Sequence, residues 1–487
     1  MNSSNYKSNV NTLTKKPELA LEKELANLFD KKKKSNVIPI NKNQDKDDST
    51  ELSYAKSVFA DESLVASKRG EHSSLYKWQG NYYQQQGKQE AKELAFAWLE
   101  QQAPDKARDS MAEECRKTAL LKANKLPDRP TDTYIPLRDG WLMVDEFGNY
   151  LNIEPDREIG ITYLINADLK ADYGLYKPEA QKEKSLFSNF LNKSLPDKEV
   201  QSLLQEFCGS TLLGDTRFQK AIVNIGEGSN GKSVFLEIIS ALHEKISSMR
   251  LDKLEGFGLS NLIDTSLAIA AEAPKKGLNE EILKACITGD MVSVEGKFKD
   301  IIDYKPTAKW VIACNRFPKI QDESNGLWRR LFIIEWKVVI EEGSADQIRN
   351  LSQKIISNEL KDVLDWCLEG LTRLMLRGKF APPKSVLLST EREKTENNNV
   401  ISFVEDTFLE ISPTETTKKD LIYNRYKDYC DKKSLLPYGQ QMFWKRIVSI
   451  FGQDKLVYPR KICKERIEGS NKEENIQKCF VNLAYKN

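Results

Sequence analysis

The chain is short of the residues that build zinc centres and disulfide frameworks. Among 487 residues there are two histidines, His72 and His243, and eight dispersed cysteines that form no CxxC pair. A structural zinc site needs four nitrogen or sulfur ligands at characteristic spacings, so we expect none here. Dispersed cysteines without a pairing pattern are typical of reduced thiols, which indicates an intracellular protein.

Long apolar runs are also missing. No apolar stretch reaches the roughly 20 residues that span a bilayer, and the N-terminus has no secretory-type hydrophobic segment. We therefore expect no membrane association and a cytoplasmic location. The apolar fraction of 40% still supports packed cores, and a chain of this length is long enough for several domains.

Positive and negative charges nearly balance over the whole chain, but they are unevenly distributed along it. The net charge is +2, yet residues 418–487 contain 16 Lys and Arg against 8 Asp and Glu, so the rest of the chain is acidic. A basic segment suits a polyanionic partner, because neutralised phosphates release condensed counterions. A solvated, lysine-rich pair of helices explains the same charge, so composition alone leaves both interpretations open.

The stretch NIGEGSNGKSVFLEII, residues 224–239, contains the pattern GxxxxGK(S/T). It follows the short apolar run AIVNI and precedes a segment, 233–246, whose apolar residues recur at helical spacing. A loop between a strand and a helix directs backbone N–H groups and a helix N-terminus at anionic oxygens. The pattern predicts a phosphate-binding loop, with an ordinary glycine turn as the plainer alternative.

In such a loop, the lysine reaches the β- and γ-phosphates and the following hydroxyl coordinates Mg²⁺. The residues that we expect to hold the nucleotide are Gly226, Glu227, Gly228, Ser229, Asn230, Gly231, Lys232 and Ser233.

Two later apolar runs end in polar residues. TSLAIAAEAP, 265–274, carries Glu272, and KWVIACN, 309–315, ends in Asn315. Carboxyl ends of strands beside a phosphate loop are where a metal-bound attacking water is oriented. Glu272 is therefore the candidate general base, and Asn315 is a candidate hydrogen-bond partner of the γ-phosphate or the water. Taken singly, a loop acid and a turn asparagine explain them as well.

Two more features follow the loop. Arg329 and Arg330 precede an apolar strand, and a fixed guanidinium so placed can act as a finger on a neighbouring subunit's γ-phosphate. The stretch SVEGKFKD, 293–300, predicts a hairpin with a basic tip, where Lys297 and Lys299 meet phosphates and Phe298 stacks on a base or sugar. An exposed arginine pair and a solvated β-turn are the plainer alternatives.

The order of these features resembles the superfamily 3 helicases, an AAA+ group, and in particular the phage, plasmid and poxvirus primase-helicase family. The likeness covers about residues 75–487. It is carried by LLQEFCGSTLLGDTRFQKAIVNIGEGSNGKS, ILKACITGDMVSVEGKFKD, YKPTAKWVIACNRFPKI and GLWRRLFIIEW.

The resemblance implies roles for the matching positions. Gly226 to Ser233 would bind ATP and Mg²⁺, Glu272 would be the Walker B acid and a metal neighbour of Ser233, and Asn315 would be the sensor. Arg329 or Arg330 would be the trans-acting finger, and the tip at Lys297, Phe298 and Lys299 would project into a central channel. One departure is that Ala271 stands where an acid commonly precedes Glu272, which puts the magnesium affinity in doubt.

The resemblance also implies an architecture. It is an α/β fold with a parallel-sheet AAA+ P-loop core, preceded by a small α+β and helical region and followed by a basic winged-helix-like domain. In the last domain, Lys445 and Arg446 would present cations to duplex phosphates. The expected divisions are a disordered tail at 1–70, an N-terminal domain at 71–195, the ATPase core at 196–345, a helical extension and linker at 346–400, and the winged-helix-like domain at 401–487.

The expected function is that of a homo-hexameric, ATP-dependent replicative helicase acting on single-stranded and replication-fork DNA. The chain would serve a phage, plasmid or integrated element in a bacterial cytoplasm. We expect no primase domain, so priming would need a separate protein. The missing second acid favours an alternative, a DNA-binding initiator or regulator in which nucleotide only locks an oligomer. A small-molecule kinase is a third possibility, but it would leave the arginine pair, the lysine hairpin and the basic tail without a role.

Overall fold

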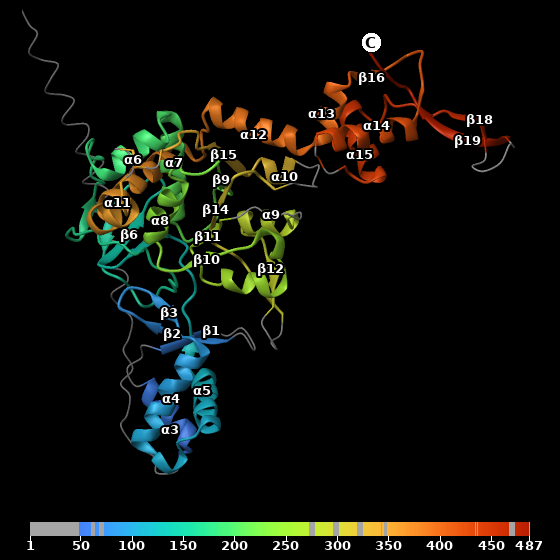
Figure 1. The fold of residues 1–487 in the computed structure, drawn as a ribbon. Coiled ribbons are helices and arrows are strands. Elements are labelled where there is room, and N and C mark those ends of the chain that lie inside the picture. Colours follow the sequence, from blue (N-terminus) through green and yellow to red (C-terminus); the bar gives the residue numbers. More distant parts are fainter. Residues whose placement is uncertain are drawn as a thin grey trace, which may run out of the picture.

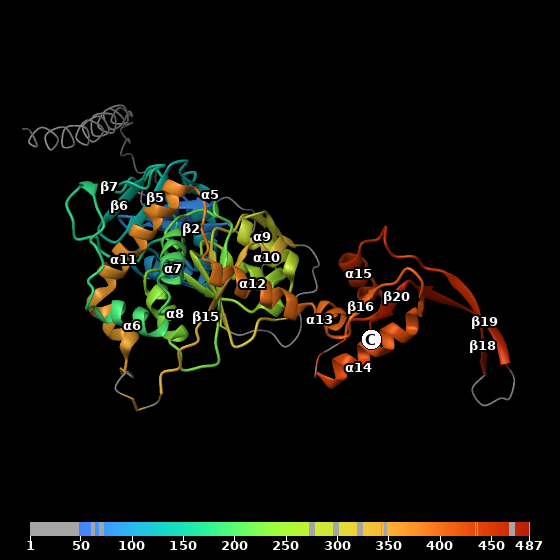
Figure 2. The same ribbon diagram turned by 90° about the horizontal axis from the view of Figure 1, so that it is seen from above.

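The chain folds into three parts. The computed structural model describes residues 48–59, 64–67, 73–271, 278–295, 301–318, 325–341, 343–344, 348–433, 435, 437–466 and 473–486. Figure 1 shows an N-terminal module, a central α/β core and a C-terminal domain that extends away from the core beyond α12. The view from above in Figure 2 shows the same separation of the C-terminal domain.

The N-terminal module combines a helical bundle with a small mixed sheet of order β3-β2-β1-β4. Tyr54, Ala55 and Ala66 are buried in its core, so the predicted disordered tail at 1–70 is wrong for the helix and strand that carry them. These two elements are too short for a clear periodic signal. The elements are α3 (Thr50–Val58), β1 (Leu64–Ser67), β2 (Ser74–Trp78), β3 (Tyr83–Gln85), α4 (Lys88–Gln102), η2 (Pro104–Lys106), α5 (Asp109–Lys122) and β4 (Asn124–Lys125).

An antiparallel sheet of order β5-β6-β7-β8 joins this module to the core. The turns RDG, at 138–140, and FGN, at 147–149, connect its first three strands, whose antiparallel register forms two hairpins. Tyr150 on β7 is buried and donates a hydrogen bond to the carbonyl of Leu368 at 2.6 Å, which anchors the sheet on α11 (Leu351–Arg377). The strands are β5 (Thr133–Leu137), β6 (Gly140–Val144), β7 (Tyr150–Ile153) and β8 (Gly174–Tyr176).

The core is a five-stranded parallel sheet of order β10-β11-β14-β9-β15. This confirms the predicted α/β core with a parallel sheet. Because every strand runs in one direction, all carboxyl ends lie along one edge and all amino ends along the other. The strands are β9 (Ala221–Ile225), β10 (Ile246–Ser248), β11 (Leu267–Ala270), β14 (Lys309–Cys314) and β15 (Leu331–Glu335).

Side chains alternate between the two faces of this sheet, and both faces are covered. Ile222 and Val311 pack into one hydrophobic cluster, whereas Val223 and Ile312 pack into another. The period of two and the burial of both faces explain why these strands are nearly continuous apolar runs.

Helices and a hairpin supply the covering layers. Helices α6, α7, α8 and α11 contribute to the first cluster, and α9, η4 and the β12–β13 hairpin contribute to the second. The helix predicted over 233–246 ends earlier, because residues 246–248 form a core strand. The elements are α6 (Leu186–Ser194), α7 (Lys198–Thr211), α8 (Lys232–Ala241), η3 (Leu251–Lys253), η4 (Gly256–Leu262), α9 (Glu280–Thr288), β12 (Val292–Val294), β13 (Ile302–Tyr304) and α10 (Asn325–Trp328).

Helix α12 (Lys384–Asn397) covers the outer side of the edge strand β15. The backbone N–H of Ile333, in the middle of β15, donates to the Oγ1 of Thr390 on α12 at 3.3 Å. A side chain thus occupies a hydrogen-bonding position that a further strand would use.

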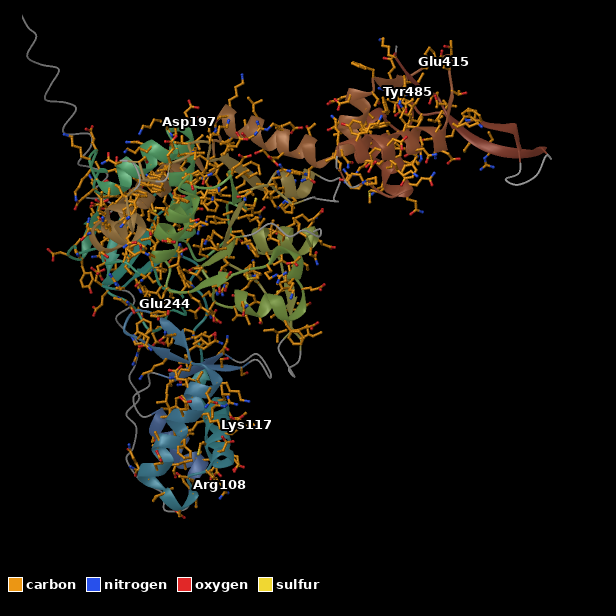
Figure 3. All side chains as sticks on the ribbon, in the orientation of Figure 1. Arg108, Lys117, Asp197, Glu244, Glu415 and Tyr485 are labelled. Atoms are coloured by element: carbon orange, nitrogen blue, oxygen red, sulfur yellow. The ribbon has the colours of Figure 1, made fainter. Side chains whose placement is uncertain are left out.

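The C-terminal domain has a hydrophobic cluster of its own, and its predicted winged-helix-like character stays a prediction. Figure 3 labels Glu415 and Tyr485 within it, and Arg425 lies 3.8 Å from the ring centroid of Tyr485. The last residues of the predicted extension and linker, ENNNV at 396–400, form the end of α12 and the start of α13. The elements are α13 (Asn399–Asp406), β16 (Leu409–Ile411), β17 (Thr417–Lys418), α14 (Lys419–Lys432), α15 (Gln440–Phe451), β18 (Arg460–Arg466), β19 (Glu473–Val481) and β20 (Leu483–Tyr485).

A pair of leucines on α11 tests the packing of the first cluster. Leu371 is fully buried, whereas Leu376 is 63% exposed on the same helix. We expect Leu371→Ala to lower the free energy of unfolding by about 2–5 kcal/mol, because a cavity remains. Leu376→Ala should change it by less than about 0.5 kcal/mol. Urea unfolding followed by circular dichroism measures both, and equal effects would contradict the assigned packing.

Candidate functional site

The predicted phosphate loop connects β9 to α8 at the carboxyl edge of the sheet. A Cβ at Gly226 would lie 2.1 Å from the Nδ2 of Asn230 and 2.6 Å from the carbonyl oxygen of Trp336, so no side chain fits there. Gly231 has a φ of 90° and begins α8 without a side-chain cap. The glycines of the pattern are therefore required by close approach and by backbone geometry.

Lys232 is held in place within the loop. Its ammonium group donates to the carbonyl of Gly226 at 2.6 Å and to the Oδ1 of Asn230 at 2.9 Å. Asn230 is buried and donates its own amide to the carbonyl of Trp336 at 3.0 Å. Burial lowers the pKa of Lys232, because the charged form loses hydration. An anion arriving in this loop would therefore meet a poorly hydrated, fixed cation.

Trp336 secures the loop from the neighbouring strand end. Its indole Nε1 donates to the Oδ1 of Asn224 on β9 at 2.8 Å, and its backbone N–H donates to the carbonyl of Ile225. Further on, the N–H of Ile340 donates to the carbonyl of Ser229 at 2.7 Å. The segment after β15 thus clamps the loop along its length.

A hollow of about 770 Å³ lies beside the loop. Its lining joins the loop to the ends of β11 and β14 and includes Asn315, which the sequence predicted to lie here. Arg316 also lines the hollow and was not predicted, although its position directly after Asn315 was a usable signal. The other lining residues are Gly228, Ser229, Asn230, Gly231, Lys232, Ser233, Val234, Leu236, Ala271, Ala313 and Cys314.

The predicted metal neighbours are described only in part. Ser233 is exposed at the first turn of α8 and lines the hollow, where a hydroxyl can meet a phosphate-bound cation. Glu272 lies outside the described residues, and Ala271 just before it lines the hollow. The roles of Ser233 and Glu272 stay predictions.

Arg329 and Arg330 lie at the opposite, amino edge of the sheet. Leu331 pairs with Ala221, so the arginines precede β15 where β9 begins rather than where it leads into the loop. At about 3.3 Å per residue, Arg330 and Gly226 are separated by roughly 20 Å along the strands. The structure therefore does not bring the arginine pair to this chain's own phosphate loop.

The two arginines differ in their surroundings. Arg329 is exposed, whereas Arg330 is half-buried and donates from Nη1 to the carbonyl of Gly326. The Nε of Arg330 is buried without a hydrogen-bond partner among the described residues. Burial, together with the charge of Arg329, lowers the pKa of Arg330. A guanidinium in this state gains by meeting an anion.

The predicted hairpin is present as β12 and β13, which pair antiparallel from Val292↔Tyr304 to Val294↔Ile302. Its expected DNA-contacting tip, Lys297, Phe298 and Lys299, lies outside the described residues.

The C-terminal cations correct one prediction. Lys445 is exposed on α15, but Arg446 is only 3% exposed and its guanidinium lies 4.2 Å from the ring centroid of Tyr438. The predicted contact between Arg446 and duplex phosphates therefore does not fit this structure. Phe443, Trp444 and Ile447 make α15 amphipathic as expected, and Arg446 lies on the packed side with them.

Comparisons with known proteins agree with the predicted relationship. Residues 224–330 match a family of unknown function, DUF5906. A putative helicase, L207/L206, of Acanthamoeba polyphaga mimivirus is 27% identical over 174 residues, and a putative helicase, 184R, of Invertebrate iridescent virus 6 is 27% identical over 263 residues. The chain is a distant homologue of these viral proteins. The predicted helicase relationship is thereby confirmed at this level.

These alignments cover 32% and 45% of this chain but only 18% and 27% of the two viral proteins. Among solved structures, two apo structures of the NrS-1 C-terminal region align with TM-scores of 0.45 and 0.46 at 12% identity. They cover 88% and 90% of this chain and 99% and 100% of those chains. Within the described residues, no helix is long and apolar enough to traverse a bilayer.

Asn230 provides a test of the loop geometry. We expect Asn230→Ala to weaken triphosphate binding by about fivefold, because it frees the ammonium of Lys232 and leaves the buried carbonyl of Trp336 unpaired. Titration with a fluorescent ATP analogue measures the dissociation constant. As a control, Asn424→Ala removes an exposed asparagine from α14 and should leave binding unchanged. Unchanged binding by Asn230→Ala would show that this amide does not organise the loop.

Proposed function

We propose that the chain is an ATP-dependent DNA helicase that acts as a homo-hexameric ring in replication of a phage, plasmid or integrated mobile element. One observation carries the proposal. The phosphate loop and the arginine pair lie at opposite edges of the same parallel sheet. The distant homology to viral proteins described as putative helicases supports the same reading.

The separation of the two edges favours action between subunits. Arg329 and Arg330 cannot reach a nucleotide some 20 Å away, because an arginine side chain extends only about 7 Å from its Cα. Arg329 is exposed and Arg330 is only half-buried, so a guanidinium of this pair could meet an anion supplied by a neighbouring subunit. A head-to-tail contact that placed one amino edge on the next carboxyl edge would close into a ring.

Each residue at or near the hollow would have a separate role in ATP cleavage. Lys232 and the N-terminus of α8 would bind the phosphates, and Asn315 would orient the attacking water or the γ-phosphate. Ser233 and Glu272 would hold Mg²⁺, which when bound neutralises charge on the phosphate oxygens. Glu272 would accept the proton of the water, and a neighbour's Arg329 or Arg330 would stabilise charge in the transition state.

DNA would be contacted at two places. The β12–β13 hairpin would carry Lys297, Phe298 and Lys299 to a single strand in the channel, where cations and a stacking ring bind any sequence. Lys445, exposed on α15, would meet phosphates of duplex at a replication fork. Priming would fall to a separate protein.

A nucleotide-locked initiator or regulator without unwinding activity is the second candidate. Its support is Ala271, which lines the hollow at the position where a second acid would strengthen metal binding. ATP turnover with and without single-stranded DNA separates the two, since a regulator shows little hydrolysis and no strand displacement.

Substitutions in the phosphate loop and at the hairpin tip test whether ATP hydrolysis drives unwinding. We expect Lys232→Ala to abolish ATP hydrolysis and unwinding, and Lys297→Ala to keep basal hydrolysis while losing unwinding. Strand displacement on 5′- and 3′-tailed duplexes and phosphate release measure these effects. Equal unwinding by both variants and the wild type would refute the mechanism.

Mixing of inactive variants tests the finger. Lys232→Ala and Arg330→Ala should each be inactive alone, but an equal mixture should regain about one quarter of wild-type ATP turnover if rings assemble at random. In such rings, one in four interfaces pairs an intact loop with an intact arginine. Arg329→Ala in place of Arg330→Ala identifies which arginine acts. A mixture that stays inactive with either variant would rule out action between subunits.

A further inference from the structure

A buried carboxylate, Asp264, lies where the N-terminal module, the core and the hairpin meet. It follows η4, and its side chain is only 2% exposed. Tyr76 on β2 donates a hydrogen bond to one carboxylate oxygen, and Thr162 donates to the other at 3.0 Å. Arg129 adds a cation at 3.8 Å. These partners come from far along the chain, so the contact joins separate parts of the fold.

The backbone of the same residue holds the hairpin. The N–H of Asp264 donates to the hydroxyl of Tyr304 at 2.9 Å, and Tyr304 is a buried residue of β13. Burial and the nearby Asp264 raise the pKa of Tyr304, so its hydroxyl stays protonated. Through its side chain and its backbone N–H, Asp264 therefore links strand β2 of the N-terminal module to the hairpin strand β13.

The geometry of Asp264 is specialised. Its φ of 56° lies in the left-handed region, which an aspartate enters more easily than most residues but at some cost. A buried carboxylate must also replace its lost hydration with hydrogen bonds and a cation. Because this residue is held by several partners at once, a shift of one partner is felt by the others.

The root of the hairpin lines a cavity of about 560 Å³ together with residues 129–134, which lead into β5, and residues 160–163, which lie between β7 and β8. Asp290 and Lys305, which flank β12 and β13, face the cavity together with Arg129, Thr162 and Asp264. The hairpin root is therefore open on this side. Val292, Val294 and Tyr304 pack into the second hydrophobic cluster, and the Asp264 contacts add a polar attachment to that packing.

Asp264 is also close in sequence to the nucleotide hollow. Strand β11 begins three residues later at Leu267 and leads directly to Ala271, which lines the hollow. Figure 3 labels Glu244 at the same junction, where Gln84 of β3 reaches its carboxylate at 3.4 Å. One strand therefore runs from the nucleotide hollow to the point where the module and the hairpin are tied.

We propose that Asp264 and Tyr304 are positioning residues, which fix the β12–β13 hairpin against the N-terminal module and so set how strongly single-stranded DNA stimulates ATP turnover. The inference rests on the proposed helicase function. Neither residue lines the hollow beside the phosphate loop, so we expect basal hydrolysis to be unchanged when either is altered.

The full chain carrying Tyr304→Phe tests this assignment. The substitution removes one hydroxyl, which leaves the buried N–H of Asp264 without its acceptor and also removes the hydrogen bond between Tyr304 and Arg129. We expect stimulation by a single-stranded oligonucleotide to fall about fivefold, the effect of one net hydrogen bond of about 1 kcal/mol, while basal turnover stays within about twofold. Tyr150→Phe is the matched control, because it removes a buried hydroxyl that bonds the carbonyl of Leu368 instead. It should leave both activities unchanged.

Amide hydrogen exchange supplies a readout that needs no catalysis. Exchange at Val292–Val294 and Ile302–Tyr304 should speed up in Tyr304→Phe and not in Tyr150→Phe. Unchanged exchange in Tyr304→Phe, or an equal change in the control, would overturn the positioning role whatever the activities show. If the wild type lacks hydrolysis that depends on Lys232, the proposed function fails, and exchange alone then decides whether Asp264 and Tyr304 hold the hairpin.

Discussion

The parallel pairing of β9 with β14 and β15 is the constraint on which the rest of the core depends. It gives the sheet two chemically different edges. The carboxyl edge carries the glycine loop with Lys232 and Asn315, and the amino edge carries the arginine pair. An antiparallel β15 would bring Arg330 to the loop of its own chain, and the two groups would then act on one nucleotide without a neighbour. The proposal that the phosphate loop and the arginine pair act between subunits therefore depends on strand direction.

The loop itself depends on contacts made outside the sequence motif. Trp336 bonds to Asn224, Ile225 and Asn230, so a residue a hundred positions away sets the shape of the cradle. Each such bond contributes about 1 kcal/mol net. Their larger effect is preorganisation, because an ammonium group already held by two oxygens loses less freedom when a phosphate arrives.

Much of the core could be predicted from the sequence, because its signals are local. Two buried strands and a turn can be predicted from AIVNI, KWVIACN and the glycine loop, without reference to any distant residue. The hairpins at RDG and FGN are equally local. The structure places Asn315 at the hollow because parallel strands bring their carboxyl ends together, which is a rule of topology rather than of this chain.

What the sequence could not supply depends on distant partners. The position of Arg446 beside Phe443 and Trp444 gave no sign that Tyr438 would take up its guanidinium. Asp264 was not singled out from the sequence, because its hydrogen bond to Tyr76 spans 188 positions. The segments 50–58 and 64–67 are too short to show their burial by periodicity. Which side of a helix is buried, and which acid is paired, is decided by tertiary packing.

The packing of α12 along β15 restricts how copies of this chain can associate. Since Thr390 occupies the N–H of Ile333, a second molecule cannot lengthen the sheet there by adding a strand of its own. At this edge of the core sheet, contacts between protomers would then have to come from side chains rather than from backbone pairing. Side-chain contacts of this kind can rearrange when a bound ligand changes, whereas a continuous ladder of backbone hydrogen bonds would fix the copies relative to one another.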